Sequence, residues 1–148
     1  MTNSTQTTPA RLDWRALLIE QFQWHWEQQA RPRLVGLSDQ EYFWEPVHPA
    51  WNVRRRNAAH FNGPAIDYPS FPYAGTADEA LMQLDDGVGR WLHGVEILGP
   101  DDLSQPCGEA EGAFAAVPIA TLVLHIHREL IHYAAEIALL RDLWAHRE

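Results

Sequence analysis

The sequence is short of cysteine, of basic residues and of long apolar runs, and each shortage excludes a class of protein. Its one cysteine, Cys107, cannot form an intramolecular disulfide and fits a reducing cytosol. Eleven Lys and Arg residues stand against twenty Asp and Glu, a formal net charge of -9, which argues against nucleic acid or an anionic membrane surface as the main partner. No run approaches the roughly 20 apolar residues of a membrane span. We therefore expect a cytoplasmic protein that binds neither nucleic acid nor membrane.

The composition predicts one folded domain. The hydrophobic share is 46% with seven tryptophans in 148 residues, enough to build a core. Residues 1–10 lack the basic and apolar regions of a signal peptide and are expected to form a disordered tail. The domain is expected to span residues 11–148.

Residues 118–144 form the longest stretch without internal proline or glycine. Its apolar residues recur at helical spacing, which predicts a long helix that faces a core. The members of that apolar side are Ile119, Leu122, Val123, Ile126, Leu130, Tyr133, Ala134, Ile137 and Leu140.

Three further helices are predicted before this one. The first spans residues 11–34, with His25 on its inward side beside Trp14, Leu17, Leu18 and Phe22, and Pro32 should kink or stop it. Residues 38–41 and 76–79 each have the spacing of a capping box, which predicts a short helical turn and a helix up to residue 98. Residues 57–73 carry too many prolines for one long helix. No β alternation is present, so the chain is predicted to be all-α.

A polar stripe follows the last helix next to its apolar side. His125, Glu129, His132 and Glu136 are separated by four, three and four residues, which places them within roughly 60° of arc. Imidazoles and carboxylates arranged in this way can hold a metal or move protons. The alternative interpretation is a half-buried polar seam in which these groups satisfy one another and the backbone.

Residues 124–144 resemble the last helix of the DinB-like superfamily, which includes mycothiol-dependent maleylpyruvate isomerases and other thiol-dependent transferases. Further stretches are similar to an actinobacterial branch of that superfamily, namely residues 22–47, 51–54, 56–68, 75–99 and 106–112. The resemblance implies an antiparallel up-and-down bundle of four helices. It also implies a divalent metal, zinc or nickel, held by one histidine of helix two and by two ligands, four residues apart, in helix four.

The chain departs from the family pattern at two of these three ligands. The helix-four motif places its first ligand at Glu129 and its second at Tyr133, where histidine is usual and where a phenol that titrates near 10 is a poor ligand. Related sequences carry most of helix two after residue 54, and here two arginines take its place. The helix-two histidine therefore has no counterpart, and His60 matches only the far end of that helix. We expect a truncated second helix.

A reorganised metal site would use Glu129, His132 and His125. Because one helix face cannot close a tetrahedral shell, a further ligand is needed from His25, His60 or a second subunit. In an enzyme, His25 is the candidate catalytic residue, as an acid–base group. His93 and His127 lack partners at suitable spacing and are expected to be surface or packing residues.

Three function classes stay open at this point. The first is a metal- and thiol-dependent transferase or isomerase, and the second is a module that binds an unknown small molecule. The third is an interaction protein whose metal chemistry has degenerated. A four-helix bundle that lacks most of one helix leaves an apolar face exposed to solvent. The chain is therefore also expected to form a homodimer in which the helices of the second copy cover that face.

Overall fold

The computed structural model describes residues 12–48, 52–53 and 72–148, and these residues are mostly helical with no β-strand among them. The predicted all-α fold is confirmed. The expected tail, the truncated second helix, the arginines at 54–56 and His60 lie outside the described residues. Within the described part of the chain, none of the helices has the length and apolarity needed to cross a membrane.

Helix α1 is shorter than predicted as a regular helix. It spans Trp14–His25, and Asp13 caps it by accepting a hydrogen bond from the backbone N–H of Ala16. A π-helical turn continues it over Trp26–Ala30, closed by a bond from Arg31 N to Trp26 O of 2.8 Å. A 3-10 turn, Pro32–Leu34, then ends the segment, as expected from the proline.

Two capping residues start the next helices where the sequence places them. Ser38 accepts a bond from Glu41 N and begins the short helix α2, Asp39–Tyr42. Thr76 accepts one from Glu79 N and begins α4, Ala77–Glu96. Two short 3-10 turns, Asp102–Ser104 and Glu109–Phe114, lead to α5, Ile119–Ala145.

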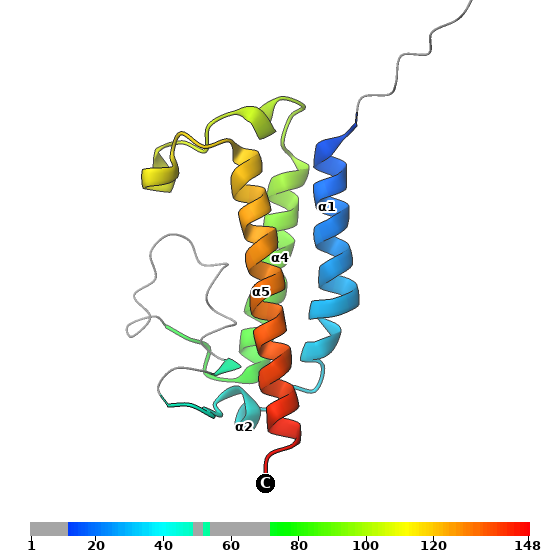
Figure 1. Cartoon of the computed structure of the whole chain (residues 1–148), viewed down its shortest axis with the longest axis vertical. Helices are drawn as coiled ribbons and strands as arrows, with labels where there is room; N and C mark the ends of the chain where they lie inside the picture. The colour runs from blue at the N-terminus through cyan, green and yellow to red at the C-terminus, as the bar shows by residue number, and fades with distance from the viewer. Residues whose placement is uncertain (1–11, 49–51, 54–71) are drawn as a thin grey trace, which may run out of the picture.

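Side-chain bonds between distant residues show how the long helices lie. Arg15, at the start of α1, donates to the carbonyls of Glu96 and Leu98 at the end of α4, at 3.3 and 2.8 Å. Arg33, after α1, bonds to Asp142 near the end of α5 at 2.6 Å. Thus α1 starts where α4 ends and finishes where α5 finishes, and Figure 1 shows the three helices side by side along the long axis of the molecule.

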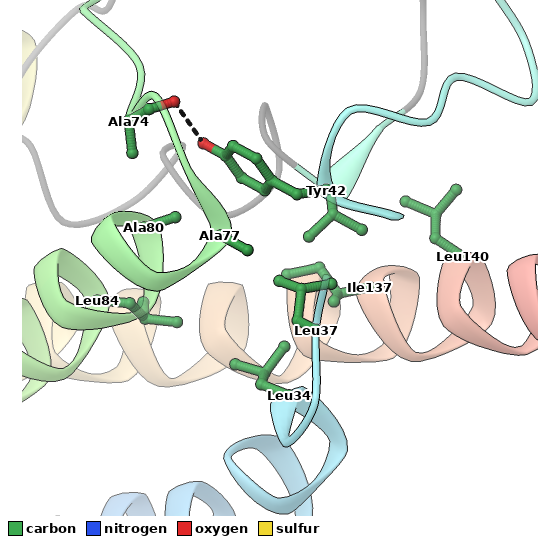
Figure 2. Close-up of a cluster of buried hydrophobic side chains, with 10 residues drawn as sticks. Leu34, Leu37, Tyr42, Ala74, Ala77, Ala80, Leu84, Ile137 and Leu140 are labelled. Carbon is green, nitrogen blue, oxygen red and sulfur yellow. Dashed lines mark hydrogen bonds between the residues drawn. The ribbon is translucent and has the colours of Figure 1, made fainter. Parts of the chain in front are cut away.

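The core lies on the faces that these helices turn to one another. One cluster, drawn in Figure 2, joins the start of α4 and the end of α5 to the residues around α2, with Tyr42 donating to the carbonyl of Ala74. A second cluster, further along, joins Phe22 of α1 to Val88 of α4 and Leu130 of α5. The predicted apolar side of α5 is confirmed, because its buried members include Val123, Leu130, Ile137 and Leu140, and α4 buries Leu84, Val88 and Val95 against it and α1.

The predicted inward side of α1 is wrong at its first turns. Phe22 is 2% exposed, but Trp14 is 63% and Leu17 36% exposed, so the helix carries apolar residues on its outer side as well. When a short helix has apolar residues on both sides, their spacing does not predict which side packs against the rest of the protein.

Candidate functional site

The polar stripe of α5 is present, and the structure divides it into two His–Glu pairs. His125 Nδ1 lies 3.5 Å from Glu129 Oε1, and His132 Nε2 lies 3.3 Å from Glu136 Oε1. The carboxylates are the more covered members, with side chains 19% and 16% exposed, whereas the imidazoles are 44% and 59% exposed. The stripe is therefore half-buried, with its acids against the protein and its imidazoles toward solvent.

Arg128 contacts both members of the first pair at the atoms that could bind a metal. Its Nη2 atom lies 2.6 Å from His125 Nδ1, and its Nε atom lies 3.6 Å from Glu129 Oε1. A guanidinium can only donate hydrogen bonds, so His125 Nδ1 is the acceptor in this contact. A metal bound between His125 Nδ1 and Glu129 would have to displace this cation.

The second pair repeats the first seven residues later, without the arginine. Residue 135, which corresponds to Arg128, is an exposed alanine. His132 also packs edge-to-face on Tyr133, with ring centroids 5.0 Å apart. The two pairs thus form an internal comparison in which the neighbouring residue is arginine in one and alanine in the other.

The expected three-ligand set of His125, Glu129 and His132 does not come together among the described residues. Within that part of the chain no three His, Cys, Asp or Glu side chains are grouped so that they could hold a metal ion. Each His–Glu pair supplies two ligands, while a structural zinc site needs four protein ligands and a catalytic one three. Among the described residues, each pair therefore supplies fewer ligands than such a site needs.

His25 lies on a different side of α5 from the stripe. Phe22, one turn before His25 in α1, packs on His127 with ring centroids 4.9 Å apart. His127 is two residues from both His125 and Glu129, so it points away from the stripe by about 160° around the helix. Helix α1 therefore covers the His127 side of α5, and the structure does not bring His25 to the candidate metal ligands.

Burial affects two histidines, His25 of α1 and His127 of α5. Desolvation lowers the pKa of His25 and the pKa of His127 from the ordinary value of 6.5. The Nε2 atom of His25 is buried and has no hydrogen-bond partner among the described residues. His127 is a packing residue, which agrees with the expectation from the sequence, whereas His93 is exposed on α4.

Arg128 was not among the site residues predicted from the sequence. The contact with His125 was readable from the sequence, because residues three positions apart are neighbours on a helix surface. Comparison of the chain with protein-family models, with curated proteins and with solved structures finds no match.

Proposed function

We propose that the chain is a DinB-like helical protein whose divalent-metal site has degenerated, and that it acts as a homodimeric interaction module rather than as an enzyme. The observation that carries the proposal is the guanidinium of Arg128, which bonds to His125 and lies beside Glu129. A fixed positive charge at the ligand atoms opposes a divalent cation there. The second pair, His132 and Glu136, offers only two ligands from this helix.

The size of this electrostatic effect can be approximated. A unit charge about 4 Å from a divalent ion costs roughly 2 kcal/mol at the dielectric constant of water. Water is the right reference because the side chain of Arg128 is 71% exposed. Removal of the guanidinium should therefore raise zinc affinity at the first pair by at least about tenfold.

The test is a zinc titration of protein purified without an affinity tag. Wild type should contain far less than one metal per chain by elemental analysis, with weak added zinc bound at His132 and Glu136. Arg128→Ala should bind zinc more tightly, and His125→Ala in that background should remove the gain. Arg90→Ala is the matched control, because Arg90 is an equally exposed arginine of α4 that pairs with Asp86.

A metal-dependent transferase or isomerase is the second candidate, supported by the half-buried carboxylates of Glu129 and Glu136 beside imidazoles. It requires about one metal per chain in the purified wild type, lost in Glu129→Ala and His132→Ala. That result would overturn the degenerate-site proposal. A small molecule that raises the melting temperature without metal would instead identify a binding module.

A further inference from the structure

The side of α5 that points away from the core carries a line of exposed residues that we name the outer α5 face. Its members are Leu124, Arg128, Ile131, Ala135, Leu139 and Asp142. At 100° per residue they lie within about 80° of arc, centred roughly 140° around the helix from buried Leu130. Three of them are large and apolar, with exposures of 56%, 53% and 51% for Leu124, Ile131 and Leu139. In Figure 1, α5 lies in front of α4, and no described element is drawn over it.

Two opposite charges lie on this face at equal distances from Ala135. Arg128 precedes Ala135 by seven residues and Asp142 follows it by seven, and these are the only exposed Asp, Glu, Lys or Arg residues of α5. Their side chains are 71% and 62% exposed. The apolar neighbours are placed in the same way, since Ile131 precedes Ala135 by four residues and Leu139 follows it by four. The face therefore has matched positions on the two sides of Ala135, apolar with apolar and one charge with its opposite.

This pattern is self-complementary about a two-fold axis. An axis through Ala135 and perpendicular to α5 relates two antiparallel helices, and each residue then faces the one equally far beyond Ala135 in the other copy. Ile131 faces Leu139 of the partner subunit, and Arg128 faces Asp142 of the partner subunit. A copy packed parallel to α5 would instead set each charge against itself. The small side chain of Ala135, at the axis, allows the helices to approach to the roughly 8–10 Å of packed helices.

Both charged side chains keep a polar atom for this contact. Arg128 places Nη2 against His125 and Nε near Glu129, while its Nη1 makes no hydrogen bond within the described part of the chain. Asp142 accepts from Arg33 through Oδ1 at 2.6 Å, and its Oδ2 makes no hydrogen bond to the described residues either. A contact between Nη1 and Oδ2 of two copies would therefore add to the existing bonds and break none of them.

We infer that the outer α5 face is the homodimer interface, with α5 of each copy packed antiparallel on α5 of the other about a two-fold axis at Ala135. The inference rests on the homodimer of the proposed function and names its surface. Zinc affinity and dimer affinity are separate measurements, so the degenerate metal site and this interface can fail independently.

The size of the face sets the strength of the dimer. Residues 124 to 142 extend over roughly 27 Å of helix, and one face of a helix is roughly 10 Å wide, which gives a flat area on the order of 300 Å². A stable interface buries roughly 800 Å² on each partner. Because the outer α5 face is smaller, the dimer should dissociate in the micromolar range rather than persist on dilution.

Cysteine cross-linking under mild oxidation, in a Cys107→Ala background, tests the register. Residue 135 lies on the axis, so helices roughly 9 Å apart bring its two Cα atoms to roughly 4–5 Å, close enough for a disulfide. Ala135→Cys should therefore give a covalent dimer on a non-reducing gel. Thr121→Cys is the matched control, because Thr121 is exposed on α5 but roughly 21 Å from Ala135 along the helix. Its two copies would lie roughly 40 Å apart in the antiparallel pair and should not cross-link.

Sedimentation velocity across micromolar concentrations tests the charges. Asp142→Arg sets like charges against each other at both symmetry-related contacts and should weaken the dimer at least about tenfold. Adding Arg128→Asp exchanges the charges and should restore the affinity to within about threefold of wild type. Arg90→Asp, at an exposed arginine of α4, is the control and should sediment as wild type. Circular dichroism checks that each variant is folded.

The outcomes separate the interface from the homodimer itself. A wild-type chain that stays monomeric across this range would overturn both. A dimer that cross-links at residue 121 rather than at residue 135 would be parallel and would overturn the interface alone. A dimer that Asp142→Arg leaves unchanged, or that the exchanged charges do not restore, would do the same.

Discussion

Arg141, near the C-terminal end of α5, joins that helix to α2 and to the segment after α1. Its guanidinium bonds to Glu41 at 2.7 and 3.3 Å and to the backbone carbonyls of Arg33 and Val35 at 2.5 and 2.9 Å. The side chains of Glu41 and Arg141 are 4% and 17% exposed. One side chain of α5 thereby holds both α2 and the segment after α1.

Arg141→Met should destabilise the protein by about 3–5 kcal/mol, because it leaves the carboxylate of Glu41 buried without its cation. Urea unfolding followed by circular dichroism measures the change. Arg90→Met, at an exposed pair, should cost less than about 1 kcal/mol. Equal losses in the two variants would mean that burial of the Glu41 pair does not matter.

The buried histidines predict how stability depends on pH. Burial lowers the pKa of His25 and of His127 in the folded state, so below the ordinary value of 6.5 the unfolded chain binds protons that the folded chain does not. Stability should therefore be constant with respect to these groups above that pH and fall as pH drops below it. His127→Gln should flatten the fall in urea midpoints relative to wild type. An unchanged slope in that variant and in His25→Gln would contradict this account.

At the scale of the element, the sequence predicts where the helices begin but not which side of α1 is exposed. The hydroxyls of Ser38 and Thr76 lie at the caps that their spacing predicts, because capping is a local property of four residues. The α4 cap has an addition that spacing does not reveal, since Asp39 of α2 accepts a bond from Ala77 N at 2.7 Å. Which side of α1 is covered depends on α4 and α5, so its own periodicity could not decide it.

Thr76→Ala should destabilise the protein by about 1 kcal/mol, because it removes the acceptor of the Glu79 N–H at the first turn of α4. Thermal unfolding monitored by circular dichroism is the measurement. The control is Thr121→Ala, an exposed threonine in the first turn of α5, which should be neutral or slightly stabilising since alanine is the better helix former. A larger loss at Thr121 than at Thr76 would count against the cap.

At the scale of the whole molecule, the sequence predicts the all-α class but not the connections that join its ends. Arg15 and Leu98 are 83 positions apart, and Glu41 and Arg141 are 100 apart. Such pairs follow from how the helices are placed and leave no local pattern. The same holds for the candidate site. Its polar stripe is predicted by the spacing of the residues, but its position away from α1, and hence from His25, depends on how the helices pack.

The π-helical turn at Trp26–Ala30 sets the rotational phase of everything between it and α2. In an unbroken α-helix Ala30 would stand about 80° around the axis from Phe22, but one extra residue in the turn reduces the offset to roughly 20°. Both side chains can then enter the core, where they are 2% and 5% exposed. Deletion of one residue from this turn would rotate Leu34 out of alignment with α5. The same rotation would displace the carbonyls of Arg33 and Val35, which accept hydrogen bonds from Arg141.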